Sequence, residues 1–253
     1  MKLPIATFCL LASCISTGNA IELCSRSSPT HTVALLELYT SEGCSSCPPA
    51  DKFLQNVAQN AGLHPDQVIP LALHVDYWDY IGWKDPFAKR LFTERQQELS
   101  AYVHSRTVYT PEFFINGKEF RNWNSGLTSE LEKIKQQAAL ASIKLRQTGI
   151  SNDKISIEID SNSSQSGELH VALLENGLSS KVSAGENQGI TLRHDAVARV
   201  WIDPIAVVAS TPKKTTMTVN IPANANRQHL SLVAFIQNQQ GNILQAVELT
   251  VCL

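Results

Sequence analysis

Two cysteines separated by two residues, Cys44 and Cys47, are the residues of this sequence best suited to chemistry. An apolar run at residues 33–39 precedes them and predicts a buried strand, and residues 51–61 carry apolar side chains at helical spacing. The pair therefore lies where a strand ends and a helix begins. At this spacing the two thiols are able to close a disulfide within a single turn.

The predicted position of Cys44 near the N-cap of that helix favours its thiolate. Unpaired N–H groups and the positive end of the helix dipole stabilise negative charge there, and such surroundings lower a thiol pKa from ~8.5 to roughly 3.5–7.5. Pro48 and Pro49 remove only donors that have no intrahelical partner, so the N–H groups of Ser46 and Cys47 remain able to face the sulfur. The sequence thus predicts an exposed, acidic sulfur at Cys44 and a site for thiol–disulfide exchange.

Other uses of the cysteine pair stay open. Together with His74 it would suit Cu(I), a soft ion that accepts thiolate and imidazole ligands, although a lone histidine at a strand end is more often a hydrogen-bonded structural residue. A static disulfide or half of a zinc site is another alternative, but structural zinc needs four protein ligands and the sequence has no second closely spaced pair. We expect no metal and no organic cofactor, because the electrons of the exchange reside in the two sulfurs.

Length and composition describe a globular chain with ample core-forming residues. The 253 residues are 43% hydrophobic, and the formal net charge is −2. This length allows one large domain or two ordinary ones. Because no basic stripe is present, nucleic acid is not an expected partner.

Residues 1–20 are predicted to be a signal peptide. One lysine precedes a mostly apolar stretch at residues 3–13, and small residues at positions 18 and 20 suit cleavage after Ala20. Residues 11–14 also resemble a bacterial lipobox, which would make Cys14 a lipidated N-terminus. Either interpretation predicts an exported protein, periplasmic or secreted, with membrane attachment only if that cysteine is lipidated.

Removal of this segment leaves four cysteines, Cys24, Cys44, Cys47 and Cys252. In an oxidising compartment an even set of four favours two bridges, with three possible connectivities. If Cys44 and Cys47 form the local bridge, a structural disulfide joins Cys24 to Cys252 and fastens the two ends of the mature chain together.

Residues 31–147 alternate between strand and helix patterns in the order β-α-β-α-β-β-α. After the first helix the predicted elements are a strand at 67–76, a helix that starts at Asp85-Pro86, a strand at 112–115, a hairpin turn at Asn116-Gly117 leading to 118–120, and a helix from Thr128 to Leu145. An aromatic loop follows the second strand and contains Tyr77, Trp78, Tyr80 and Trp83. These rings are interpreted either as a wall of a peptide groove or as packed core.

From residue 148 onward a two-residue alternation replaces helical spacing. The strand candidates are residues 155–160, 169–174, 196–202, 215–221, 230–237 and 243–251. Short strands with turn-rich connections predict an all-β, sandwich-like domain at 148–253. The stretch 185–189, Gly-Glu-Asn-Gln-Gly, is most simply a turn, and His194 has no partner that the sequence identifies.

The Cys44-Ser45-Ser46-Cys47 motif and the later Thr110-Pro111 dipeptide resemble the thioredoxin superfamily. The resemblance implies that Cys44 is the nucleophile and Cys47 the resolving thiol. It implies a cis proline at Pro111, with Thr110 facing the cysteines and pairing with a bound peptide. It also implies that Glu37, on the strand before the motif, is a buried acid that moves protons for the resolving thiol.

More narrowly, residues 37–51 and the 185–189 stretch with His194 resemble DUF1223, a family of exported bacterial proteins without an assigned substrate. The leading hypothesis is therefore an exported thiol–disulfide oxidoreductase. Its expected partners are a disulfide-containing protein or peptide and a redox partner that resets the pair. Ser45-Ser46 replaces the usual dipeptides between the cysteines, so the direction of electron flow stays open. A Cu(I)-binding protein and a non-catalytic interaction module are the alternatives.

Overall fold

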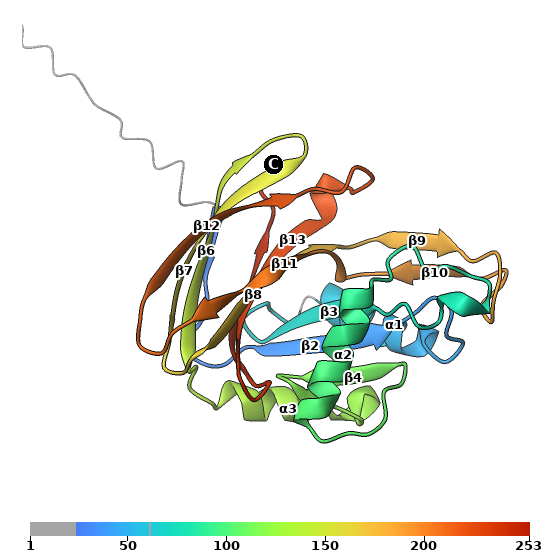
Figure 1. Ribbon diagram of the computed structural model, residues 1–253, viewed down its shortest axis with the longest axis horizontal. Helices are drawn as coiled ribbons and strands as arrows, with labels where there is room; N and C mark the ends of the chain where they lie inside the picture. Colours follow the sequence, from blue (N-terminus) through green and yellow to red (C-terminus); the bar gives the residue numbers. More distant parts are fainter. Residues whose placement is uncertain (1–23, 61) are drawn as a thin grey trace, which may run out of the picture.

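The computed structural model describes residues 24–60 and 62–253, which form strands and three α-helices (Figure 1). The predicted signal peptide and Cys14 lie outside the described residues. Elements of the first half are β1 (Ser25–Ser27), β2 (Ala34–Thr40), α1 (Pro48–Gln59), β3 (Val68–His74), the 3₁₀ helix η2 (Asp79–Ile81), α2 (Arg90–Tyr102), β4 (Glu112–Ile115), β5 (Lys118–Glu119) and α3 (Trp123–Lys135). None of the described helices is long and apolar enough to cross a lipid bilayer.

Strands dominate the rest of the chain. They are β6 (Ala141–Ile150), β7 (Lys154–Ser163), β8 (Gly167–Glu175), β9 (Leu178–Lys181), β10 (Thr191–His194), β11 (Val197–Val207), β12 (Lys213–Asn220), β13 (Leu230–Asn238) and β14 (Ile243–Thr250), with the 3₁₀ helix η3 (Arg227–His229) before β13. The two short strands β9 and β10, which pair with each other, have no counterpart among the predicted elements.

One eight-stranded sheet, ordered β14-β13-β8-β11-β3-β2-β4-β5, runs through both halves of the chain. The halves meet where Val197 of β11 pairs in parallel register with Ala72 of β3. Beside this junction Phe92 of α2 and Phe235 of β13 belong to the same buried apolar cluster. The two predicted domains therefore share a sheet and a core, because the edge strand β3 of the first half pairs with β11 of the second.

The last helix is shorter than its apolar pattern predicts. It ends at Lys135, and the residues from Ala141 onward form β6, so the boundary predicted at 147/148 falls inside a strand. Ala141 and Leu145 are four residues apart, a spacing that fits both a helical and a two-residue period. Buried Ile143 between them follows the strand alternation. Ladder pairing of β6 with β7 decides between the two periods.

A four-stranded sheet, β1-β6-β7-β12, packs face to face on the β14-β13-β8-β11 part of the large sheet. Figure 1 shows these two layers on the left of the molecule. Alternate residues of β7, Ile155, Ile157 and Ile159, enter the shared core with Leu169 and Leu232 of the opposite layer. This alternation is the one expected when one face of a strand is buried.

A disulfide joins Cys24, just before β1, to Cys252, just after β14. The side chain of Gln147 on β6 accepts from the Cys252 N–H at 3.0 Å and donates to the Cys252 carbonyl at 2.7 Å. The two ends of the described chain are thereby fastened to the small sheet.

The two faces of β2 carry different helices. Leu36 and Leu38 pack in the cluster that contains residues of α1 and α3, whereas Leu35 and Tyr39 pack with Phe92 of α2. Successive residues of a strand point to opposite faces. Even-numbered positions of β2 therefore face the helix that follows the cysteine pair, and odd-numbered positions face away from it.

The strands β9 and β10 and the turn between them (residues 178–194, here called the arm) extend beside α1 and η2 (Figure 1). At the base of the arm, Gln59 of α1 donates to the Asp195 carboxylate at 2.7 Å. At its tip, Gly185 has φ +75° and lies so close to Ile81 and Trp83 that an added Cβ would be 3.4 Å from each side chain. The arm therefore rests on the segments that surround the cysteine loop.

Candidate functional site

Cys44 and Cys47 are bonded to each other at the corner between β2 and α1, with their Cα atoms 5.4 Å apart. Cys47 is the N-cap of α1, and Pro48 and Pro49 occupy the first turn. The Cys47 N–H donates to the Cys44 carbonyl at 3.2 Å. Cys44 thus lies near the N-cap, as predicted, since it is bonded to the N-cap residue. The prediction that the Cys47 N–H faces the Cys44 sulfur is wrong, because the turn that brings the cysteines together uses this N–H.

The Thr110–Pro111 peptide bond is cis and lies beside the pair. The Thr110 carbonyl oxygen is 3.8 Å from Cys44 Sγ and accepts a hydrogen bond from Ser46 Oγ at 3.5 Å. Trp78 Nε1 donates to Thr110 Oγ1 at 2.8 Å, which ties this loop to the segment after β3. The residues predicted for exchange and for partner binding thus meet at one place.

The Cys44 sulfur is not exposed, in contrast to the sequence-based expectation, since the whole residue is only 1% accessible. The loop of the cis peptide lies against the sulfur. Trp78 packs on the preceding Gly43, where an added Cβ would be 3.0 Å from the Trp78 Cβ. Ser45 and Ser46 are the exposed residues of the loop between the cysteines. The pair is thus buried by segments that the local motif does not contain.

Glu37 does not lie beside the cysteines. It occupies an odd-numbered position of β2, and its two carboxylate oxygens accept from Nε and Nη2 of Arg95 on α2 at 2.8 and 2.9 Å. The Tyr39 hydroxyl donates to the same carboxylate at 2.9 Å, and Arg95 also donates to Gln237. The proton-transfer role predicted for Glu37 is therefore wrong. Strand alternation turns this side chain to the opposite face of the sheet, where it forms a buried ion pair.

A buried carboxyl group that no motif indicated lies on the cysteine face, at Asp51. The backbone N–H of Asp51 donates to the Cys47 carbonyl at 3.0 Å, so Asp51 and Cys47 are one helical turn apart on the same face of α1. Thr40 Oγ1, at an even-numbered position of β2, donates to Asp51 Oδ1 at 2.8 Å. Burial raises the pKa of Asp51, although the charges of His194 and His74 oppose the increase. The i, i+4 spacing from Cys47 is the sequence signal that points to this residue.

His74 forms a buried pair with Asp85, whose Oδ2 is 2.7 Å from His74 Nδ1. Burial disfavours protonation of His74, but the neighbouring carboxylate outweighs it and raises the pKa of His74. In return, and against the effect of burial, His74 lowers the pKa of Asp85. Asp85 also accepts from the N–H groups of Glu42 and Phe87. It is therefore not the cap of α2, which begins at Arg90.

Glu42, two residues before Cys44, pairs with His194 of the arm, with Oε1 3.0 Å from Nε2. Trp83 Nε1 donates to the other carboxylate oxygen at 2.8 Å. The rings of His74 and His194 are 4.9 Å apart between centroids, and all of these side chains except Trp83 are buried. Across residues 24–60 and 62–253, no group of three or more His, Cys, Asp or Glu side chains is placed to hold a metal ion.

The tip of the arm binds the backbone on both sides of Cys44. Asn187 Nδ2 donates to the carbonyls of Glu42 and Cys44 at 2.9 and 3.0 Å. Glu186 Oε2 accepts from the Ser45 N–H at 2.9 Å. Hydrogen bonds from the Ser45 hydroxyl and N–H lower the pKa of Glu186. More than 140 residues separate the arm from the loop, and only the 185–189 motif marked it in the sequence.

One protein family matches this sequence over most of its length. The model for "Protein of unknown function (DUF1223)" matches residues 35–237, which include the cysteine loop, the cis peptide and the arm. The chain belongs to the DUF1223 family. No curated protein matches the sequence.

Two solved structures are similar to this DUF1223 protein over most of its length. The crystal structure of a protein from Agrobacterium tumefaciens has a TM-score of 0.61 and 26% sequence identity, and the match covers 87% of this chain and 96% of the other. HBP35 of Porphyromonas gingivalis has a TM-score of 0.62 and 13% identity, and the match covers 88% of this chain and 76% of the other. The second likeness shows the fold alone.

The aromatic loop of this family member has a supporting role at the site. Trp78 and Trp83 each donate an indole N–H to the site, to Thr110 and Glu42 respectively. The Tyr77 hydroxyl donates to Gln96 of α2. Tyr80 on η2 is 83% exposed. Three of the four rings are therefore held in place by hydrogen bonds around the site, and the fourth is exposed.

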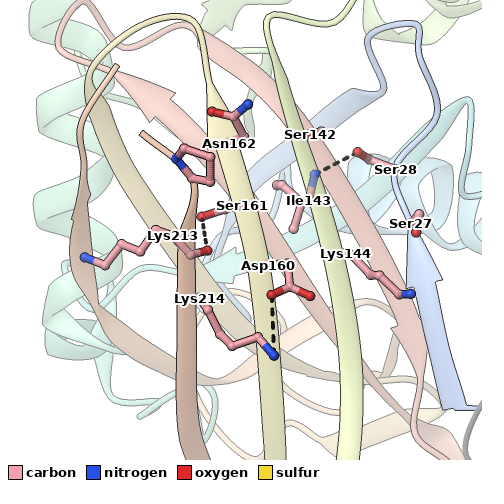
Figure 2. Close-up of a pocket in the computed structure, with 11 residues that line it drawn as sticks. Ser27, Ser28, Ser142, Ile143, Lys144, Asp160, Ser161, Asn162, Lys213 and Lys214 are labelled. Atoms are coloured by element: carbon pink, nitrogen blue, oxygen red, sulfur yellow. Dashed lines mark hydrogen bonds and ion pairs between the residues drawn. The ribbon is translucent and has the colours of Figure 1, made fainter. Parts of the chain in front are cut away.

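A hollow of about 570 Å³ lies elsewhere, on the small sheet (Figure 2). Figure 2 shows serine, lysine and aspartate side chains of β1, β6, β7 and β12 around it, including Lys144 and Asp160. Lys214 Nζ is 3.9 Å from an Asp160 oxygen, and the Ser161 hydroxyl donates to the Lys213 carbonyl. None of the residues that line this hollow belongs to the cysteine site.

Proposed function

We propose that this DUF1223 protein is an exported thiol–disulfide oxidoreductase, with a thioredoxin-like α/β half joined to a β-sandwich. One observation carries the proposal. The Cys44–Cys47 disulfide closes a strand-to-helix corner, and Cys44 Sγ lies 3.8 Å from the Thr110 carbonyl at a cis Thr110–Pro111 peptide. The order β2-α1-β3-α2-β4-β5-α3 supports the thioredoxin-like assignment.

In the reduced form the exchange needs two steps. The Cys44 thiolate attacks a substrate disulfide, so that a mixed disulfide forms and one substrate sulfur leaves as a thiolate. The Cys47 thiol then gives up its proton and attacks the Cys44 sulfur, which releases the second substrate sulfur and re-forms the Cys44–Cys47 bond. The substrate gains two electrons and two protons, one proton released by Cys47 and one from the solvent, and a dithiol partner returns the pair to its reduced state.

Asp51 is the proton acceptor that this arrangement favours for Cys47. It lies one turn further along the same helical face, and burial raises its pKa, which brings a carboxyl group closer to the working range of a general base. Thr110 and Pro111 would position the partner chain, since the Thr110 carbonyl is beside the attacking sulfur. Glu37 has no part in this scheme because Arg95 neutralises it on the other face.

Burial of Cys44 favours a second candidate, a non-catalytic interaction module in which the bridge is a static cross-link. A residue that is 1% accessible cannot attack a protein substrate until its cover moves. The cover consists of the Thr110 loop, Trp78 and the arm, which are held by hydrogen bonds rather than by a covalent bond. The two candidates therefore differ in one measurable property, the reactivity of the Cys44–Cys47 bond.

Export is part of the proposal. The Cys24–Cys252 and Cys44–Cys47 disulfides support an oxidising compartment, as does the signal-like composition of residues 1–20. The expected partners are disulfide-bonded proteins or peptides and a separate redox protein that resets the pair.

Trapping of the mixed disulfide tests the proposal. The reduced Cys47→Ala variant is incubated with oxidised glutathione and with a disulfide-bonded peptide, and adducts are measured by mass spectrometry. We expect a stable adduct on Cys44 and none in the Cys44→Ala variant. A Cys24→Ser/Cys252→Ser protein with the 44–47 pair intact serves as the control and retains exchange. If the 44–47 bond resists mild dithiol reductants and Cys47→Ala forms no adduct, the bridge is a static cross-link.

A further inference from the structure

The arm leaves one negative charge unneutralised next to the reactive sulfur. The Glu186 carboxylate is bound to the N–H of Ser45, the residue after Cys44, at 2.9 Å. With standard covalent dimensions this contact places the carboxylate within about 8 Å of Cys44 Sγ, a distance comparable to the Debye length of about 8 Å at physiological ionic strength. Its charge therefore acts on the sulfur.

The buried ionisable groups around the cysteine loop have side-chain partners of their own. His194 faces Glu42 and His74 faces Asp85, while the Asp51 carboxyl is bound by Thr40. Glu186 forms no ion pair with any described residue, and its hydrogen-bond partner is Ser45. Because Glu186 is exposed and its pKa is lowered, it is ionised at neutral pH. Glu186 is thus an exposed carboxylate close to Cys44, bound to a backbone N–H and paired with no cation among the described residues.

We propose that Glu186 is a positioning residue bound to the Ser45 N–H, and that its charge keeps the Cys44 thiol less acidic and the disulfide harder to reduce. This inference rests on the proposed function. Reduction of the bridge by a dithiol adds two electrons and, when Cys44 ionises, one proton, and it leaves a thiolate at residue 44 and a thiol at residue 47. A neighbouring carboxylate disfavours that thiolate but has no charge to repel in the disulfide. The oxidised form is favoured as a result.

The charge of Glu186 bears on the direction of electron flow. A pair whose disulfide is stabilised relative to its thiolate is a better reductant of its substrates. The arm therefore biases the site toward substrates that are themselves disulfides, and away from the oxidation of substrate thiols. Asn187, which binds the Cys44 carbonyl, holds the arm so that Glu186 reaches Ser45.

The test compares wild type with Glu186→Gln, which keeps a hydrogen-bond acceptor but removes the charge. The pH dependence of Cys44 alkylation is measured on the reduced proteins, and the reduction potential is measured against glutathione. We expect a lower alkylation midpoint, with about threefold more thiolate in the variant below that midpoint. A threefold change in the equilibrium constant corresponds to about 14 mV toward a more oxidising potential. Gln188→Ala, on the same exposed turn, is the matched control and leaves both values unchanged.

Salt separates a charge effect from a structural one. At about 1 M salt the Debye length falls to about 3 Å, so the difference between Glu186→Gln and wild type is expected to vanish. Equal midpoints and potentials at low salt would overturn the role of Glu186 while leaving the exchange reaction intact. A wild-type bridge that no dithiol reduces would instead overturn the proposed function itself. A difference that persists unchanged in high salt would show that the substitution acts through the conformation of the loop, and would also overturn the inference.

Discussion

Two disulfides join cysteines of the described residues, and they differ in span, burial and surroundings. Cys24–Cys252 spans a sequence separation of 228 and joins the ends of the described chain, while Cys44–Cys47 spans a separation of three inside one turn. The long-range bridge is the more accessible of the two, since its cysteines are half-buried and those of the local bridge are buried. Accessibility alone would therefore not select the pair that we propose to be reactive.

What distinguishes the local bridge is its surroundings. A cis peptide lies beside it, and the buried groups of Asp51, His74 and Asp85 lie on the same side of the sheet. The long-range bridge is held instead by the neutral side chain of Gln147. One bridge therefore constrains the fold, and the surroundings of the other are those on which the proposed exchange function rests.

Breaking each bridge separately gives the largest contrast. In the chain-entropy model, closing the long loop is worth about 5 kcal/mol and closing the short one about 2 kcal/mol. We expect Cys24→Ser/Cys252→Ser to lose about 3 kcal/mol more stability than Cys44→Ser/Cys47→Ser, as measured by urea unfolding. Exchange activity should show the reverse order, retained in the first variant and lost in the second. Equal losses of stability would remove the structural half of the comparison.

Glu37→Gln tests whether the acid on the far face of β2 is structural. The substitution leaves the Arg95 guanidinium buried without its ionic partner, and breaking a buried pair typically costs about 3–5 kcal/mol. We expect this loss in urea unfolding, with the exchange rate of the folded fraction unchanged. A slower exchange at full folding would restore a catalytic role to Glu37.

Asp51→Asn is the matching experiment on the cysteine face. We expect resolution of the mixed disulfide to slow by about 100-fold, the lower range for loss of a general base, and the adduct to accumulate in stopped reactions. The free energy of unfolding at neutral pH should increase in the variant, whereas its exchange rate falls. Because burial raises the folded-state pKa of Asp51, wild type loses stability as pH rises from about 3.9 through that value. The variant does not share this loss. Lys52→Ala, on the exposed face of α1, is the control.

The smallest effect is expected from the ionic pair that lies beneath the cysteine loop. The pKa of His74 is raised by Asp85, so its contribution to stability is complete below the unfolded value of about 6.5 and is lost as pH rises through the folded value. The difference in unfolding free energy between wild type and His74→Gln should therefore be larger at pH 6 than at pH 9. The lowered pKa of Asp85 preserves its own contribution until acid pH. A difference that grows with pH would contradict this assignment.

Local sequence patterns predicted turns and element junctions that depend on neighbouring residues. A Cys-x-x-Cys at a strand-to-helix corner and a turn at Asn116-Gly117 follow from spacing and residue type. The turn is formed with φ values of 49° and 80°, which glycine and asparagine tolerate. The same kind of reasoning misplaced the end of α3, because Ala141 and Leu145 fit two periods and only pairing with β7 selects one.

By itself, then, the sequence determined where the two sulfurs lie along the chain and which turn brings them together, since those features depend on residues a few positions apart. Tertiary structure decided the rest. It turned Glu37 toward Arg95, set Asp51 against Thr40, and brought Glu186 onto Ser45 across a sequence separation of 141. The physical reason is that strand register and sheet order assign each side chain to a face, and these are settled by pairing between segments that the local pattern does not connect.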